Sequence, residues 1–284
     1  IKQKGRLGLI MPVILLCSII APYSLLRWQQ LERQMAASDS MHIGVVQGNI
    51  AQDEKWSPGL QQQTLDNYIG QSQELTRKGR AVLVVWPETA LPFYAVDHPL
   101  LLSVRDLAVQ EQIALLTGAP WFKQPAANDQ DMVTSYYNSA LLFDADGRIA
   151  DIYSKSHLVP FGEYVPLRTM LPFLAPLVEA VGDFSAGSIQ QALACHNSRI
   201  GVLICFESIF PDIARHWVEA KANVLVNLTN DAWYGRSSAP HHSLAMAVLR
   251  SVETRRSMVR AANTGFSGFI DPLGRLQQVS PLFE

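Results

Sequence analysis

The stretch Gly201-Val-Leu-Ile-Cys205-Phe-Glu207 places a cysteine at the end of a short aliphatic run, with a carboxylate two positions further on. Such a run is typical of a strand buried on both faces of a sheet, and open α/β sheets place their chemistry at the carboxyl ends of these strands. Cys205 is therefore a candidate nucleophile. An alternative stays open from this stretch alone, because unpaired cysteines are also among the residues most often buried in protein cores.

Two further segments bring ionisable side chains to the ends of expected strands. Glu88 follows the hydrophobic run Val82–Val85, and Lys155 follows the strand-like stretch Gly147–Tyr153. A thiol with a pKa of about 8.5 is mostly protonated at neutral pH, so it needs a base or a cation before it attacks. We expect Glu88 to take that proton, and Lys155 to stabilise an oxyanion together with the backbone N–H of Phe206. The expected product is a thioester, formed without a histidine.

The motifs around these residues resemble those of the nitrilase superfamily, whose catalytic set is Glu, Lys and Cys. The amino-acid sequences of these motifs resemble those of the superfamily's membrane branch, the apolipoprotein N-acyltransferases of bacteria. The similarity runs from about His42 to the C-terminal end. The matching stretches are WPETA at Trp86–Ala90, KSHLVPFGEYVP at Lys155–Pro166, NDAWYG at Asn230–Gly235 and VQGNI at Val46–Ile50.

The resemblance implies a fold and a set of residue roles. The fold is an α-β-β-α sandwich, and the roles are Glu88 as general base, Lys155 as oxyanion stabiliser and Cys205 as nucleophile. Phe206 departs from the branch, which more often has tyrosine there, so a hydrogen bond from that phenol is in doubt. The remaining expected site residues support the site (Glu163, Glu207, Phe206) or bind substrate (Trp56, Trp233, Asn138), with loop bracing as the alternative role for Asn138.

The implied reaction is acyl transfer by a ping-pong mechanism, with no cofactor and no metal ion. Cys205 takes an acyl chain from a phospholipid and passes it to the N-terminal amino group of a diacylglyceryl-cysteine apolipoprotein. Two alternatives are an amidase that hydrolyses small carbon–nitrogen bonds and a non-catalytic scaffold that binds lipoproteins. The intact Glu88, Lys155 and Cys205 argue against the scaffold, and an apolar N-terminal segment argues against a small soluble substrate.

That N-terminal segment, Gly8–Leu26, carries no formal charge. As a helix with a rise of about 1.5 Å per residue it would span roughly 28 Å, close to one hydrocarbon thickness. Lys2, Lys4 and Arg6 precede it, which indicates a cytoplasmic start and a periplasmic catalytic domain at the bacterial inner membrane. A cleaved signal peptide is the alternative, because it shares the basic start and the apolar stretch.

Composition sets the limits of this interpretation. The 284 residues are 48% hydrophobic, which is enough for the core of one large α/β domain. The net charge of −2 gives no case for nucleic-acid binding. Cys17, Cys195 and Cys205 are irregularly spaced, so we expect no metal site and a free Cys205. We therefore expect a membrane helix and linker over 1–40 and a catalytic domain over 41–284, monomeric, with family members extending further at both ends.

Alternating patterns predict a mixed sheet with covering helices. Two hairpins are expected, one around the turn Asp144–Gly147 and one joining Gly265–Asp271 to Arg275–Val279. The other expected strands are His42–Gln47, Val82–Val85, Ile113–Thr117, Tyr137–Phe143, Arg148–Tyr153, Arg199–Ile204 and Asn223–Asn227. The expected helices are Pro58–Thr76, Leu100–Gln112, Pro211–Ala220 and His242–Ser257.

Two further segments are candidates for lipid contact. Prolines interrupt the apolar stretch Pro166–Ser188, so we expect no long regular helix there. The resemblance implies an arm near the bilayer, and the alternative is a loop that covers the core. Four arginines cluster at the end of the last expected helix and just beyond it. We expect them to form a solvated helix face, with a phospholipid-headgroup site as the alternative. They are Arg250, Arg255, Arg256 and Arg260.

Overall fold

The computed structural model describes residues 2–51, 55–124, 134–164 and 183–283. The chain divides into two compact units, Ile1–Ser40 and Met41–Glu284. The first is one helix, α1 (Lys2–Ala37), which continues past the expected end at Leu26. Within the described residues, Ile10–Ala37 is the one helical stretch long and apolar enough to cross a membrane. A signal sequence has the same character, so both alternatives for this segment stay open.

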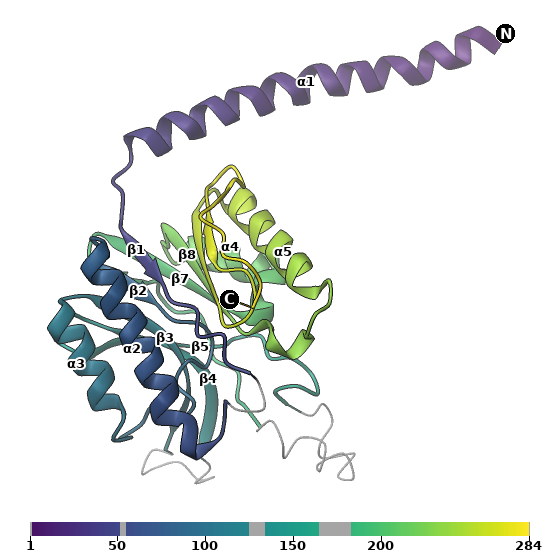
Figure 1. Cartoon of the computed structure of the whole chain (residues 1–284). Helices are drawn as coiled ribbons and strands as arrows, with labels where there is room; N and C mark the ends of the chain where they lie inside the picture. Colours follow the sequence, from purple (N-terminus) through teal and green to yellow (C-terminus); the bar gives the residue numbers. More distant parts are fainter. Residues whose placement is uncertain (1, 52–54, 125–133, 165–182, 284) are drawn as a thin grey trace. The chain divides into compact units, whose positions relative to one another are not determined.

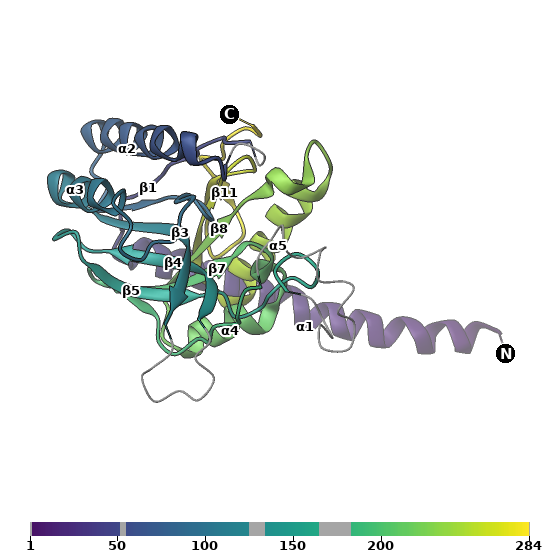
Figure 2. The same cartoon turned by 90° about the horizontal axis from the view of Figure 1, so that it is seen from below.

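The second unit contains two mixed sheets (Figures 1 and 2). In the first sheet, β1, β2 and β3 run parallel, and β4 and β5 continue antiparallel. The predicted hairpin between β4 and β5 is confirmed: Asp144 Oδ1 accepts hydrogen bonds from two backbone N–H groups of the turn, and Gly147 takes a φ of 72°. The strands are β1 (Ile43–Val45), β2 (Leu83–Val85), β3 (Ala114–Lys123), β4 (Ser135–Phe143) and β5 (Ile149–Ser154).

The second sheet has the order β11-β10-β9-β8-β7-β6. Its centre, β7 to β9, is parallel, and the outer strands pair antiparallel. The predicted second hairpin is confirmed as β10 and β11. The strands are β6 (Leu193–Cys195), β7 (Ser198–Ile204), β8 (Val224–Thr229), β9 (Ser257–Ala262), β10 (Gly268–Ile270) and β11 (Leu276–Gln277).

Side-chain alternation explains why the central strands are apolar on both faces. Leu83 and Val85 of β2 pack into a core shared with the second sheet, including Val202 of β7. Val84 between them packs outward into a second core with Leu65 and its neighbours in the covering helices. The helices α2 (Gln61–Lys78) and α3 (Leu101–Glu111) cover the first sheet, and α4 (Pro211–Glu219) and α5 (Ala239–Thr254) cover the second. The layers are those of the expected α-β-β-α sandwich.

The structure also departs from the expected elements. The predicted helix His242–Ser257 is wrong at its end, because Arg255 takes a left-handed φ of 56° and stops α5 at Thr254. The strand β9 then begins at Ser257 and was not predicted, and neither was the short β6. The expected arm Pro166–Ser188 lies outside the described residues up to position 182.

Candidate active site

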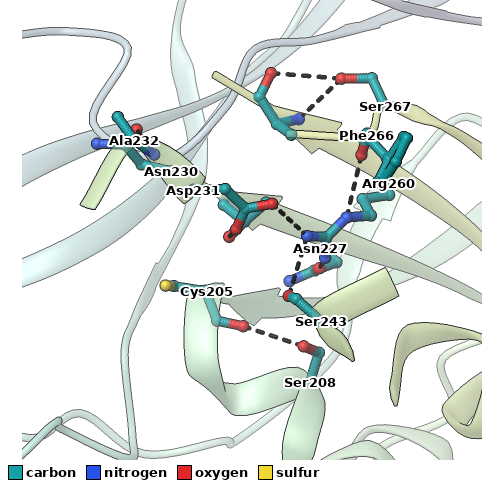
Figure 3. Close-up of polar contacts among 12 residues, drawn as sticks. Cys205, Ser208, Asn227, Asn230, Asp231, Ala232, Ser243, Arg260, Phe266 and Ser267 are labelled. Carbon is teal, nitrogen blue, oxygen red and sulfur yellow. Dashed lines mark hydrogen bonds and ion pairs between the residues drawn. The ribbon is translucent and has the colours of Figure 1, made fainter. Parts of the chain in front are cut away.

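Cys205 lies where β7 ends and a short 3₁₀ helix, η3 (Cys205–Ile209), begins. Its φ of 51° lies in the left-handed region, which a residue with a side chain occupies at a cost of order 1–3 kcal/mol. The Ser208 hydroxyl donates to the Cys205 carbonyl at 3.1 Å and holds this turn (Figure 3). All three cysteines are free, so the thiol is available as a nucleophile.

Glu88 follows β2 and is 7% exposed. Asn138 on β4 donates from Nδ2 to Glu88 Oε1 at 2.8 Å, and the same Nδ2 lies 3.0 Å from Glu163 Oε1. Among the described residues, none hydrogen-bonds Glu88 Oε2, although this oxygen is buried. Asn138 therefore fixes the carboxylate by one oxygen and leaves the other able to accept a proton.

Lys155 follows β5 directly, and its side chain is 1% exposed. Its Nζ contacts both carboxylate oxygens of Glu163, at 2.9 Å to Oε1 and 2.8 Å to Oε2. The backbone N–H of Val159 donates to Glu163 Oε2 at 2.9 Å. Glu163 thus holds the ammonium group in the buried site and is itself held by Asn138 and the main chain.

Glu207 is completely buried and joins the cysteine turn to the lysine segment. Its Oε2 accepts from the N–H of Ile204 at 2.7 Å. Its Oε1 accepts from the Tyr153 hydroxyl at 2.7 Å, from the N–H and hydroxyl of Ser156, both at 2.8 Å, and from the N–H of His157 at 3.1 Å. One carboxylate therefore sets the position of both strand ends, one from each sheet.

The electrostatics of the site favour a protonated thiol at rest. Burial, and then the charge of Glu88, raises the pKa of Cys205 to about 12, against the opposing effects of Lys155 and Thr229. Burial also raises the pKa of Glu88, against the opposing charge of Lys155. Burial lowers the pKa of Lys155, but Cys205, Glu88 and Glu163 together raise it above its ordinary value. A thiol of this kind attacks only if a base takes its proton, and Glu88 interacts electrostatically with this thiol.

A buried ion pair supports the cysteine from the other side (Figure 3). Arg260 on β9 donates from Nη2 to Asp231 Oδ2 at 2.9 Å, and the Thr229 hydroxyl donates to Asp231 Oδ1 at 3.1 Å. Thr229 also lies close enough to Cys205 to lower the pKa of the thiol. Arg260 further donates to Phe266 O at 3.0 Å and to Asn227 Oδ1. The thiol is thus connected through two polar side chains to a fully buried guanidinium group.

Comparison with known proteins identifies the fold family. The carbon-nitrogen hydrolase family model matches residues 42–284, which include Glu88, Lys155 and Cys205. The chain belongs to the carbon-nitrogen hydrolase family. The resemblance to the nitrilase superfamily that the motifs indicated is confirmed.

Curated relatives of this carbon-nitrogen hydrolase include apolipoprotein N-acyltransferases. One from Geobacter metallireducens is 43% identical over 243 residues, and one from Gloeobacter violaceus is 38% identical over 256 residues. These alignments cover 85% and 89% of this chain but 46% and 47% of the relatives. The chain therefore spans about half the length of the curated relatives it matches.

Solved structures share the fold at low sequence identity. A carbon-nitrogen hydrolase from Helicobacter pylori G27 matches with a TM-score of 0.60 and 16% identity, over 84% of this chain and 85% of that chain. A mutant amidase from Nesterenkonia sp. AN1 matches with a TM-score of 0.58 and 19% identity, over 85% and 86%. That structure shows covalent addition of the acetamide moiety of fluoroacetamide at the active-site cysteine.

Three of the expected site residues of this carbon-nitrogen hydrolase are exposed aromatics. Trp56 is 47% exposed, Trp233 on η4 (Asp231–Tyr234) is 60% exposed, and Phe206 next to Cys205 is 37% exposed. Phe206 packs edge-on against Phe210, with 6.1 Å between ring centroids. The role of these rings in substrate binding stays a prediction, and so does that of Asn138, which the structure places between two carboxylates.

Sequence patterns did not indicate four polar residues of the site: Lys55, Thr229, Asp231 and Arg260. Arg260 is 0% exposed and Arg250 is 7% exposed, so their expected place on a solvated helix face is wrong. The one sequence signal for Asp231 and Thr229 was their place in and beside the NDAWYG motif, and Lys55 directly precedes Trp56. Thr229 ends β8 and Asp231 follows it two residues later, so these two do stand at the end of a mostly apolar strand. Lys55 and Arg260 do not follow this pattern.

Proposed function

We propose that the protein transfers an acyl chain from a phospholipid to the N-terminal amino group of a diacylglyceryl-cysteine apolipoprotein. The proposed chemistry rests on the buried carboxylate of Glu88. One of its oxygens has no hydrogen-bond partner among the described residues, and the carboxylate interacts electrostatically with Cys205. The names of the relatives, at 43% and 38% identity, support the choice of substrates. The apolar helix Ile10–Ala37 supports a substrate that is itself in a membrane.

The first half-reaction would form the thioester. Glu88 takes the proton of Cys205, and the thiolate attacks the ester carbonyl carbon of the phospholipid. Lys155 and the backbone N–H of Phe206 stabilise the oxyanion of the tetrahedral intermediate. The carbon–oxygen bond to the glycerol then breaks, and Glu88 returns the proton to the departing lysophospholipid oxygen. Because Glu88 first takes and then gives up the same proton, the transfer is internal to the site.

The second half-reaction would consume the thioester. The amino group of the acceptor attacks the thioester carbonyl carbon, Glu88 takes one proton from the nitrogen, and the carbon–sulfur bond breaks. Glu88 then returns that proton to the sulfur, so the products are an amide and a free thiol. Water competes with the amine, so exposed rings such as Trp56, Trp233 and Phe206 would serve by keeping the thioester dry.

Hydrolysis of small amides is the second candidate. The fold likeness to an amidase with a covalently modified cysteine favours it, because the same thioester chemistry would act on a short amide. The first proposal accounts better for the apolar helix and for the relatives' names. We further propose that the protein acts as a monomer at the bacterial inner membrane, with the catalytic unit in the periplasm.

A labelled phospholipid distinguishes these candidates. The full-length protein in detergent micelles is incubated with a phospholipid that carries a labelled acyl chain, and neutral hydroxylamine is then added. We expect a hydroxylamine-labile label that mass spectrometry places on Cys205. The variant Cys205→Ala should lose it, whereas Cys195→Ala, a change at a buried cysteine on β6, should keep it. No adduct from phospholipid, together with turnover of a short amide, would favour the amidase instead.

A further inference from the structure

Lys55 is a buried lysine to which the catalytic set assigns no role. Its side chain is 1% exposed, and its Nζ donates a hydrogen bond to the backbone carbonyl of Glu88 at 3.0 Å. A buried ammonium group is costly unless it is paired or hydrogen-bonded. Its position beside the proposed general base therefore needs a physical reason.

The hydrogen bond of Lys55 links two segments of the site. The backbone N–H of Lys55 donates to the carbonyl of Ala51 at 3.1 Å, and the exposed Trp56 follows directly. The Nζ contact ties Lys55 and the adjoining Trp56 to the main chain of Glu88, whose carboxylate is held separately by Asn138. Glu88 is thus fixed at its backbone and at its side chain by two different parts of the chain.

The charges of the buried group give a second reason. Lys55 interacts electrostatically with both Glu88 and Cys205. With the thiol protonated, the two lysines Lys55 and Lys155 balance the carboxylates of Glu88 and Glu163. When the proton moves from Cys205 to Glu88, the thiolate replaces the carboxylate charge and the balance is kept. Without Lys55 these buried side chains would carry one uncompensated negative charge in both states. Ionisation of Glu88 or of Cys205 would then be less favourable.

Two further titratable groups face this site from η4 and leave the balance unchanged. Asp231 is paired with Arg260 at 2.9 Å, so the two charges offset each other. Burial raises the pKa of Tyr234 to about 12, so this phenol is neutral at physiological pH.

We propose that Lys55 is a positioning residue for the reaction proposed above: its hydrogen bond fixes the main chain of Glu88, and its positive charge favours the ionised forms of Glu88 and Cys205. This role rests on the proposed proton transfer between these two residues. Lys55 acts through them, because its hydrogen bond goes to the backbone carbonyl of Glu88.

The charge of Lys55 has its own pH range. Burial lowers its pKa to about 8, and Glu88 and Cys205 offset only part of that effect. Lys55 is therefore charged below about pH 8 and neutral above it. Its influence on Cys205 should be strong below this pH and fade above it. A lysine that only supported the fold would produce no such pH dependence.

Alkylation of Cys205 by iodoacetamide tests this role without any lipid. The rate is followed on the full-length protein in detergent micelles from about pH 5 to about pH 10, with the modified Cys205 peptide quantified by mass spectrometry. Lys55→Met removes the charge and the donor, Lys55→Gln removes the charge but keeps a donor, and Lys55→Arg keeps both. Lys78→Met is the matched control, because Lys78 is an exposed lysine paired with Glu74.

We expect Lys55→Met and Lys55→Gln to slow alkylation about tenfold at neutral pH, and this difference from the wild type to shrink above about pH 8, where Lys55 is neutral. Lys78→Met should keep the wild-type profile within about threefold. Lys55→Arg should stay within about threefold of the wild type below about pH 8 and react faster than the wild type above it, because arginine keeps its charge there. If both Lys55→Met and Lys55→Gln keep the wild-type alkylation profile, the proposed role of Lys55 is wrong. If only Lys55→Gln keeps it, the charge of Lys55 has no part in that role. If the Met variant fails to fold by circular dichroism, the comparison of Gln with Arg decides.

The same measurements separate this role from the proposed function. A shifted alkylation profile without any phospholipid-derived thioester on the wild-type protein supports Lys55 and overturns acyl transfer. A thioester on Cys205 together with an unshifted profile supports acyl transfer and overturns the role of Lys55.

Discussion

Glu88 is the side chain whose protonation state matters most for the proposed reaction. Burial raises its pKa above the ordinary value, more than Lys155 and the hydrogen bond from Asn138 lower it. The native state therefore binds this proton more tightly than the unfolded chain does. Its contribution to stability is fully present at low pH and is lost as the pH rises through the raised pKa of the folded state. Above this raised pKa the ionised Glu88 carboxylate is present at a cost in stability, and this is the form that the proposed reaction requires.

Glu88→Gln should separate these two effects. The amide keeps an oxygen that accepts from Asn138, but it cannot take a proton, so we expect thioester formation to fall by about 10²–10⁴-fold. The melting temperature near neutral pH should equal or exceed that of the wild type, and the difference should shrink towards lower pH. The measurements are labelling of Cys205 and thermal unfolding across pH. Glu219→Gln, at an exposed position, is the control, and wild-type labelling by Glu88→Gln would contradict the assigned base.

Whether a site residue could be predicted from the sequence depends on the pattern of the residues around it. Glu88, Lys155 and Cys205 each follow an apolar strand, so the pattern alone indicated that they meet at strand ends. Lys55 follows no strand and lies in a polar stretch, where a lysine is usually solvated. Its burial depends on a contact with the backbone of Glu88, 33 residues away, which no local pattern records.

At the scale of elements, β9 shows where periodicity fails. Its central Arg260 is completely buried, because Asp231, Asn227 and the carbonyl of Phe266 accept from its guanidinium group. A charged residue inside a strand interrupts the apolar pattern, so the sequence does not indicate a strand here. The partners that make such burial tolerable come from other elements and are known only once the sheet has formed.

Gly265→Ala should test how tightly this network supports the cysteine. A Cβ at Gly265 would lie 2.0 Å from Asp231 Oδ2, so the carboxylate would have to move. We expect a loss of about 1–3 kcal/mol in the free energy of unfolding and slower alkylation of Cys205, because Asp231 accepts from Thr229. Gly70→Ala is the matched control: nothing lies within 4 Å, and the residue is inside α2, so a gain of about 0.5–1 kcal/mol is expected. Chemical denaturation measures both, and wild-type stability of Gly265→Ala would show that Asp231 is free to move.

At the scale of the whole molecule, periodicity and resemblance contributed different parts of the prediction. Alternation of strands and helices indicated a mixed sheet, whereas the resemblance supplied the division into two sheets packed face to face. Apolar residues on both faces of β2 and β7 are compatible with many pairings. The pairing of the two sheets is determined by side-chain packing between distant segments, and a single sequence does not display it.

The proposed membrane arrangement makes the last prediction. Lys2, Lys4 and Arg6 precede the apolar part of α1, and the positive-inside rule then places the chain beyond this helix outside the cytoplasm. The catalytic unit begins at Met41, after α1 has ended at Ala37. Cys17 lies within α1 and must be replaced before a new cysteine can report on the catalytic unit.

The test uses Glu219→Cys in a Cys17→Ser background of the full-length protein, in bacteria whose outer membrane alone is permeabilised. We expect the new cysteine to react with a membrane-impermeant maleimide. Position 219 is exposed at the end of α4, so a reagent in the periplasm can reach it. The Cys17→Ser protein without the new cysteine measures any reaction of Cys195 and Cys205, and a cytoplasmic thiol protein reports on leakage. Labelling only after lysis would place the catalytic unit in the cytoplasm, where its proposed acceptor would have to be rejected as well.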